Sequence, residues 1–433
     1  MPRQVREVVF VDGLRTPFGR AGSLYAHTRA DDLVIRCVRE LLRRNPQLPG
    51  ARVDEVAIAA TTQTGDQGLT IGRTAALLAG LPRTVPGFAI DRMCAGAMTA
   101  VTTVAAGIAV GAYDVAVAGG VEHMGRHPMG EGVDPNPRIL AERLVDPSAL
   151  VMGATAENLH DRLPGITRQR ADAFALASQV RTAKAYANGR IQPDLVTVAV
   201  RHPVPASAAA APAAAAATGT AAHGEAAPRG APADETADGA LAWGLATLDE
   251  APRDTSLEQL AALRTPFRPH GRVTAGNSAG LNDGATASLV VAEEVARELG
   301  LPVAMRLVSY GYAGVEPEVM GLGPIPATER ALRLAGLSID DIGLFELNEA
   351  FAVQVLAFLE HFGIADDDPR VNPWGGAIAL GHPLAASGVR LMTQLARQFA
   401  EHPEVRYGLT AMCVGIGMGG AVIWENPSWE GRR

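Results

Sequence analysis

The feature of this sequence that most restricts its fold is an alternation of strand-like and helix-like segments that occurs twice in the same order. Short apolar runs alternate with longer stretches whose apolar residues recur at helical spacing, which predicts a mostly parallel sheet with helices on both faces. In the first half we expect strands at 6–11, 56–61, 85–90 and 114–119, and helices beginning near 31, 70 and 94. In the second half we expect strands at 288–292, 303–310, 343–347, 407–412 and 420–424, and helices ending near 299, 335, 362 and 399.

A cysteine stands where one of these strands gives way to a helix. Cys94 follows the apolar run 85–90 and begins an Ala/Gly-rich helix. The positive end of a helix dipole stabilises a thiolate, so this position predicts a lowered pKa and a nucleophile. A lone cysteine in an apolar run also fits a small buried core residue, as we expect for Cys37 on the apolar face of the first helix.

Two later segments favour the reactive interpretation of Cys94. His382 follows a glycine-rich run in the second half, at what we take to be the same kind of strand-to-helix junction, and Cys413 lies in a glycine-rich turn. Because the two halves repeat, a pseudo-twofold axis would bring the Cys94 and His382 helix ends together. Taken singly, His382 also fits a structural histidine and Cys413 a core residue.

The bulk composition excludes several classes of function. The chain has 433 residues, enough for two or three domains, and a net charge of −8, which argues against a nucleic-acid or membrane-surface role. Its three cysteines are too few for a disulfide framework and have no metal-ligand spacing, so we expect a reducing, cytoplasmic setting and no metal. We find neither a secretory leader nor a membrane-spanning tract.

The middle of the chain interrupts the alternation. A helix is expected from Thr167 to about Asn188, but residues 203–240 consist almost wholly of Ala, Pro, Gly and Thr. This composition offers too little apolar bulk to offset the entropy of ordering, so we predict a flexible surface insertion.

With these segments in order, the chain resembles the thiolase family. The resemblance rests on Cys94, Asn348-Glu349-Ala350-Phe351, the run Gly375 to His382, Cys413-Val414-Gly415, and the segment Gly119 to Gly125, which is similar to degradative bacterial 3-ketoacyl-CoA thiolases of fatty acid β-oxidation. It implies a five-layered α/β/α/β/α fold with two similar halves, 1–125 and 266–433, and a loop domain, 126–265, that carries the insertion 203–240. It also implies a homodimer or homotetramer, and possible assembly with a hydratase/dehydrogenase subunit of a β-oxidation complex.

The resemblance assigns roles to five residues. Cys94 attacks the 3-keto carbon after His382 takes its proton, and Cys413 supplies the second proton transfer. His382 and a water held by Asn348 stabilise the enolate, and the N–H groups of Cys94 and Gly415 stabilise the tetrahedral adduct. Coenzyme A is a substrate here, and no bound cofactor is implied.

The resemblance also suggests contacts with coenzyme A and the acyl chain. These are Arg253 near the adenine, Phe267, Ala275, Ser278 and Phe351 along the pantetheine, and Met152 near the acyl pocket. The chain departs from the family pattern at Ala279, where a pantetheine-contacting hydroxyl is usual and only Ser278 can substitute, and at Ala385, where glycine is usual.

Three hypotheses about function remain open from the sequence. The first is a degradative 3-ketoacyl-CoA thiolase, and the second is a biosynthetic acetyl-CoA acetyltransferase that forms acetoacetyl-CoA. The third is a weakly active scaffold subunit that binds a partner of the pathway. A ketoacyl synthase is disfavoured because it uses paired histidines and lacks a second catalytic cysteine, and a cysteine protease because Cys94 lacks the signatures of those families.

Overall fold

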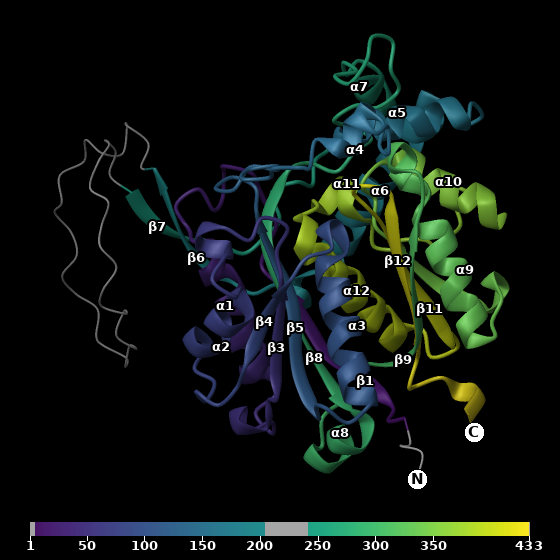
Figure 1. The fold of residues 1–433 in the computed structure, drawn as a ribbon. Helices are drawn as coiled ribbons and strands as arrows, with labels where there is room; N and C mark the ends of the chain where they lie inside the picture. Colours follow the sequence, from purple (N-terminus) through teal and green to yellow (C-terminus); the bar gives the residue numbers. More distant parts are fainter. Residues whose placement is uncertain (1–4, 204–240, 433) are drawn as a thin grey trace.

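The computed structural model describes residues 5–203 and 241–432, which build two α/β halves side by side (Figure 1). The strands of the first half follow the order β4-β3-β5-β8-β1, with β2 paired to β8, and those of the second the order β10-β11-β12-β9. The first set comprises β1 (Val8–Arg15), β2 (Gly19–Arg20), β3 (Glu55–Ala59), β4 (Gly87–Ile90), β5 (Val115–His123) and β8 (Asn282–Ala292). The second comprises β9 (Met305–Gly314), β10 (Ile342–Leu347), β11 (Tyr407–Val414) and β12 (Met418–Glu425).

Helices complete the five layers that the family resemblance implies. The outer face of the first half is covered by α1 (Ala30–Arg44) and α2 (Ile71–Ala79), and that of the second by α9 (Pro324–Ala335) and α10 (Ala352–Phe362) (Figure 1). Between the halves lie α3 (Gly96–Ala109) and α12 (Ser387–Glu401). The chain therefore has the α/β/α/β/α architecture.

The prediction of a mostly parallel sheet is wrong. Among the described strands of the large sheet, β3–β4, β3–β5 and β10–β11 pair in parallel, whereas six pairs are antiparallel: β1–β8, β1–β9, β2–β8, β5–β8, β9–β12 and β11–β12. The alternation along the chain does not reveal that β8 crosses back between β1 and β5, or that β11 and β12 form a hairpin. The three-part division at 125 and 265 remains a prediction, and β8 joins the strands of the first half although it lies beyond residue 265.

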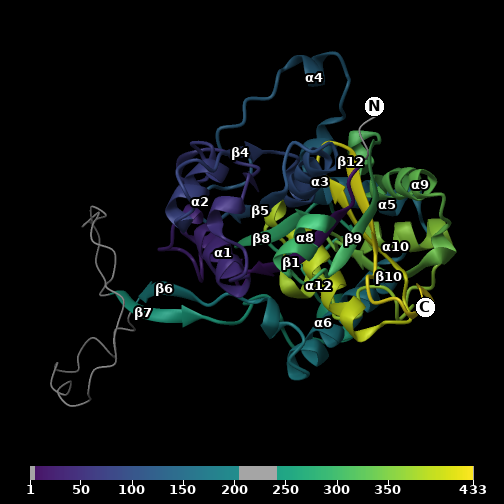
Figure 2. The same ribbon diagram turned by 90° about the horizontal axis from the view of Figure 1, so that it is seen from below.

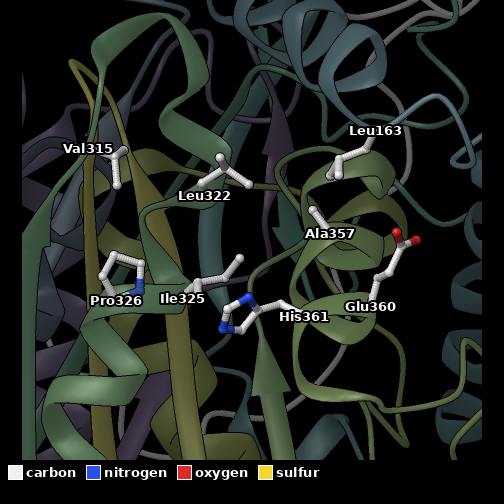
Figure 3. A pocket seen from close by; sticks show the side chains of 8 residues that line it. All are labelled: Leu163, Val315, Leu322, Ile325, Pro326, Ala357, Glu360 and His361. Carbon is white, nitrogen blue, oxygen red and sulfur yellow. The ribbon is translucent and has the colours of Figure 1, made fainter.

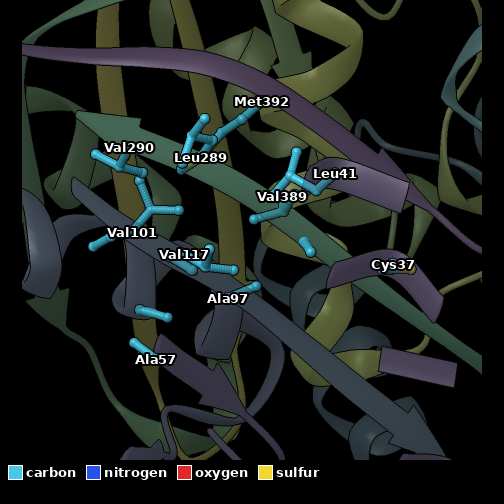
Figure 4. Close-up of a cluster of buried hydrophobic side chains, with 14 of the residues drawn as sticks. Cys37, Leu41, Ala57, Ala97, Val101, Val117, Leu289, Val290, Val389 and Met392 are labelled. Carbon is cyan, nitrogen blue, oxygen red and sulfur yellow. The ribbon is translucent and has the colours of Figure 1, made fainter. Parts of the chain in front are cut away.

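Local sequence explains why α1 forms and what it buries. Asp31 and Asp32 occupy its first turn and Arg43 and Arg44 its last, which suits the helix dipole at both ends. Its apolar face packs into the core of the first half, where Cys37 is fully buried, as predicted (Figure 4).

Close contact between α3 and α12 holds the two halves together. A Cβ on Gly388 would lie 2.4 Å from the backbone N of Met98, so only glycine permits this approach. Because Cys94 immediately precedes α3 and His382 shortly precedes α12, the contact brings both segments to one end of the helix layer (Figure 1).

The segment after β5 lies over this end of the molecule. It contains α4 (Arg138–Ala141), α5 (Met152–Arg162), α6 (Arg168–Ala187) and α7 (Leu257–Ala261), together with the hairpin of β6 (Val198–Pro203) and β7 (Leu241–Ala246), which extends away from the body (Figure 2). The predicted helix is α6, and Thr167 caps it by accepting a hydrogen bond from Arg170 N–H. The predicted flexible insertion, apart from Pro203, lies outside the described residues.

Candidate active site

Cys94 lies in a 3-10 turn, Met93–Ala95, between β4 and α3. Met93 has φ of 44°, in the left-handed region that residues other than glycine rarely adopt, and its N–H donates to the Asp91 carboxylate at 2.6 Å. This geometry leaves Cys94 only 8% exposed, with its Sγ within reach of two backbone donors, the N–H of Gly415 and its own N–H. Two converging N–H groups are the arrangement that stabilises an oxyanion.

The thiol of Cys94 is neutral in this environment. Its pKa is raised to about 12, chiefly by burial and also by the nearby carboxyl groups of Glu122 and Asp91, against the opposing effect of the two N–H donors. The lowered pKa expected from the helix dipole is therefore wrong, because desolvation outweighs the partial charges of one helix end. A neutral thiol needs a base at the moment of attack.

His382 lies in a short loop, and the strand expected before it is not observed. The segment before it is a helix, α11 (Ala377–Leu380), not a strand, because Glu349 accepts from Ile378 N–H and fixes the first turn. Gly381 follows with φ of 102°, and the backbone N–H of His382 donates to Asn282 Oδ1 at 2.9 Å. Five residues after His382, α12 begins.

Hydrogen bonds on both sides of the imidazole define its tautomer. The Ser387 Oγ lies 2.6 Å from Nδ1 and also donates to the Pro383 carbonyl at 3.2 Å, so it accepts the proton of Nδ1. On the other side, Nε2 lies 3.3 Å from Asn348 Nδ2, a donor. Nε2 therefore carries a lone pair and can act as a base.

The same imidazole is held neutral. Burial, together with the positive charge of Arg390, lowers the pKa of His382 to about 3. A neutral imidazole beside a neutral thiol is a pair in which proton transfer accompanies attack.

Cys413 and Gly415 reach the site from the end of β11 and the turn that follows. Cys413 is fully buried, and burial raises its pKa, with repulsion from an ionised Cys94 as the second cause. The 3-10 turn that carries Cys94 packs against β11 and against the turn Leu384–Ala386 just after His382. The structure thus brings the segments of Cys94, His382, Cys413, Asn348 and Gly415 together.

Ala385 fits beside the histidine because two glycines face it. A Cβ on Gly96 would lie 3.0 Å from that of Ala385, and a Cβ on Gly120 would lie 2.3 Å from its carbonyl oxygen. The methyl group of Ala385 therefore occupies space that the missing side chains of Gly96 and Gly120 leave open.

The six residues expected to contact coenzyme A or the acyl chain form three pairs. Met152 Sδ lies 3.7 Å from where a Cβ on Gly415 would be, and Phe267 packs on neighbouring Gly153. Ser278 and Phe351 meet in an isolated backbone bridge, and Arg253 donates to the Ala275 carbonyl at 2.9 Å. Within the described part of the chain the buried Ser278 Oγ has no hydrogen-bond partner, as expected of a group that serves a ligand.

Several residues that shape the site were missed by the sequence analysis. The carboxylate of Glu122 is fully buried and accepts from Thr61 N–H, Ala385 N–H and Gln67 Nε2. Asn282, Ser387 and Arg390 hold the histidine and asparagine as described. The available signal was the row of polar residues Ser387, Arg390, Gln394 and Gln398 at helical spacing along α12, which is otherwise rich in apolar residues.

A separate apolar groove lies between α9, α10 and the end of α5 (Figure 3). Its two ionisable residues are paired outside it, His361 with Glu329 at 2.9 Å and Glu360 with Arg170 at 2.9 Å. It holds none of the residues described above.

Comparison with known protein families decides the relationship. The model of the thiolase N-terminal domain matches residues 8–211 and 225–294, and that of the thiolase C-terminal domain matches residues 301–426. The chain belongs to the thiolase family.

Individual thiolases match over nearly their whole length. The 3-ketoacyl-CoA thiolase of Aliivibrio fischeri is 40% identical over 427 residues, covering 98% of this chain and 100% of that protein. The 3-oxoadipyl-CoA/3-oxo-5,6-dehydrosuberyl-CoA thiolase of Escherichia coli is 40% identical, covering 97% and 100%.

Solved thiolase structures share the fold. The acetyl-CoA acetyltransferase of Bacillus anthracis superposes with a TM-score of 0.79 at 32% identity, and human mitochondrial 3-ketoacyl-CoA thiolase with 0.80 at 30%. Each covers 98% of this chain and 99% of its own. No helix of this thiolase within 5–203 and 241–432 has the length and apolarity needed to cross a membrane.

Proposed function

We propose that this thiolase cleaves a 3-ketoacyl-CoA with coenzyme A, yielding acetyl-CoA and an acyl-CoA shortened by two carbons. The observation that carries the proposal is the environment of Cys94. Two backbone N–H groups point at its sulfur, and the adjacent segment carries His382, which is neutral and has the lone pair on Nε2. The names of the matched relatives support the same chemistry.

In the first half-reaction, Cys94 Sγ bonds to the 3-keto carbon as its proton passes to His382 Nε2. The bond between C2 and C3 then breaks, which leaves the acyl group on Cys94 and the enolate of acetyl-CoA. The Cys413 thiol protonates the enolate carbon, and acetyl-CoA departs.

In the second half-reaction, the Cys413 thiolate takes the proton of the incoming coenzyme A thiol. The coenzyme A sulfur attacks the Cys94 thioester, the shortened acyl-CoA leaves, and the Cys94 sulfur recovers its proton from His382. Every proton is thereby returned to its starting residue.

Two oxygens become negative during this cycle. We assign the adduct oxygen to the N–H groups of Cys94 and Gly415, and the enolate oxygen to His382 with a water held by Asn348. Loss of one such donor typically lowers the rate by about 10²- to 10³-fold.

We further propose that the substrate contacts are Arg253, Ala275, Ser278, Phe351, Phe267 and Met152. The unpartnered Ser278 hydroxyl supports a pantetheine contact, and the position of Met152 beside Gly415 supports an acyl contact.

The same site could run in the biosynthetic direction, as the likeness to an acetyl-CoA acetyltransferase indicates. Acyl-chain preference separates the two, because a biosynthetic enzyme would turn over only the four-carbon substrate.

We also propose a homodimer or homotetramer that acts in the cytoplasm, without a bound cofactor. The edge strand β4 supports self-association, because one side of its backbone is free to pair and all four of its residues are half-buried. A hydratase/dehydrogenase partner remains part of the proposal, and full activity of the isolated chain would exclude a scaffold-only role.

The test measures thiolysis rates for 3-ketoacyl-CoA substrates of increasing chain length. Each rate is monitored as the loss of the absorbance of the substrate's enolate. Turnover of medium or long chains supports the degradative proposal, and turnover of acetoacetyl-CoA alone supports the biosynthetic alternative. Cys94→Ala is the control, and mass spectrometry should find the acyl adduct on the Cys94 peptide of the wild-type chain. Absence of both turnover and adduct would overturn the proposal.

A further inference from the structure

We propose that Arg390 is a positioning residue that acts through Asn348, fixing its carboxamide so that the NH₂ group faces His382. The inference rests on the proposed function, because it concerns the orientation of groups assigned to the thiolase reaction.

The orientation of Asn348 follows from its two partners. Arg390 Nη2 lies 2.9 Å from Asn348 Oδ1, and a guanidinium has only donors, so the atom that faces it must be the oxygen. The Nδ2 of Asn348 then lies 3.3 Å from His382 Nε2, where it donates to the lone pair. A flipped carboxamide would set two donors against each other at Arg390 and two acceptors against each other at His382.

Arg390 is itself held by a row of buried polar side chains between α12 and β10, here called the polar seam: Glu346, Asn348, Arg390, Gln394 and Gln398. Its Nη1 donates to Gln394 Oε1 at 2.8 Å and lies 3.4 Å from the Glu346 carboxylate, which accepts from Gln398 Nε2 at 2.7 Å. Arg390, Gln394 and Gln398 recur every four residues on α12, and Glu346 and Asn348 alternate along the end of β10. One face of the helix therefore lies against one face of the strand.

The seam is poorly explained by stability alone. Arg390 and Glu346 are both fully buried, and replacing such a pair by apolar or neutral residues is often neutral or stabilising. Desolvation raises the pKa of Glu346 to about 8, which shows that its charged form is costly here, and glutamine is a close substitute because it keeps an oxygen that accepts from Gln398 Nε2. If apolar residues replaced the polar seam, Asn348 would lose the donor that fixes its orientation.

The experiment uses the full chain and a double-mutant cycle. Arg390→Met is combined with Glu346→Gln, so that no unpaired charge is left buried, and the pair of changes is made in both the wild-type and the Asn348→Ala backgrounds. Arg397→Met is the matched control, since Arg397 lies on the same helix but directs its guanidinium to other partners, forming ion pairs with Asp12 and Asp194.

We expect the Arg390→Met/Glu346→Gln chain to keep a thermal midpoint near the wild-type value while kcat falls by about 10²-fold, the effect of a lost oxyanion donor. In the Asn348→Ala background the same changes should lower kcat by less than about threefold, because groups that act as a unit are not additive. Arg397→Met should change kcat/KM by less than about threefold in both backgrounds while lowering the thermal midpoint.

Wild-type kcat in the double variant, or an equal loss in both backgrounds, would overturn the inference. A readout independent of turnover is the ¹⁵N spectrum of labelled histidine, assigned with His382→Asn. The wild-type ring should be protonated on Nδ1, and the Arg390→Met/Glu346→Gln ring should shift toward the Nε2–H tautomer. An unchanged tautomer would overturn the role of Arg390, whatever the activity of the chain. Failure of the wild-type chain to cleave 3-ketoacyl-CoA would overturn the proposed function instead.

Discussion

The hydroxyl of Ser387 lies 2.6 Å from Nδ1 of His382, in the first turn of the helix that the histidine loop leads into. Since this hydroxyl also donates to the Pro383 carbonyl, it acts as an acceptor toward the ring and keeps the Nε2 lone pair available. The tautomer of the proposed base is therefore set by a residue that the sequence analysis did not single out.

Ser387→Ala should lower kcat for thiolysis by about tenfold, because the ring loses the acceptor that favours its basic tautomer. Ser387→Thr keeps a hydroxyl and should recover most of the rate. Ser288→Ala removes a buried hydroxyl from β8, where it donates to the Ala118 carbonyl, and serves as the control with little change in kcat. A rate within twofold of wild type for Ser387→Ala would show that the tautomer does not depend on this contact.

The reactivity of Cys94 toward iodoacetamide should rise steadily with pH in the free enzyme. Because burial raises its pKa to about 12, the thiolate fraction grows about tenfold per pH unit, and the alkylation rate should do the same from pH 7 to pH 10 without a plateau. Peptide mass spectrometry separates Cys94 from Cys37 and Cys413, which are fully buried. A plateau near pH 7 would instead indicate a thiolate–imidazolium pair and contradict the neutral pair described above.

The order of elements could be predicted from the sequence, because each strand and helix carries its own periodicity. The helix expected to end near 362 is observed as Ala352–Phe362, and the expected strand at 407–412 as Tyr407–Val414. Strand direction could not, because it depends on which edge of the sheet the chain returns to. The position of β8 between β1 and β5 follows from a crossover of more than a hundred residues that leaves no local pattern.

The sequence indicates the candidate residues but not their electrostatics. Cys94, His382 and Cys413 stand out as chemically distinct residues in glycine-rich turns. The pKa of Cys94 depends on how completely the rest of the chain excludes water from it, which no short segment encodes. Arg390 and Ser387 were missed because their partners are brought to them only by the packing of α12 on β10 and on the His382 loop.

Ser278→Ala should raise KM for coenzyme A by about two- to tenfold, the value of one hydrogen bond, without lowering the thermal midpoint. In the described structure the Ser278 hydroxyl is buried without a partner, so its removal costs the free protein nothing. Ser309→Ala is the matched control, because that hydroxyl donates to the Ala331 carbonyl, and its loss should reduce stability but leave KM unchanged. An unchanged KM in Ser278→Ala would remove Ser278 from the coenzyme A site.

Asp249→Asn should lower the free energy of unfolding by about 3 to 5 kcal/mol, the usual cost of breaking a buried ion pair. Asp249 forms two hydrogen bonds with the buried guanidinium of Arg15, at 2.6 and 2.7 Å, and also accepts from Phe18 N–H and the Tyr186 hydroxyl. It therefore ties β1 to both α6 and the chain after β7, and its substitution leaves Arg15 charged and unpaired. Asp254→Asn, at an exposed position nearby in sequence, is the control and should change stability by less than about 0.5 kcal/mol in the same denaturant titration. Equal stability of the two variants would show that the loop segment is held by its apolar contacts and not by this pair.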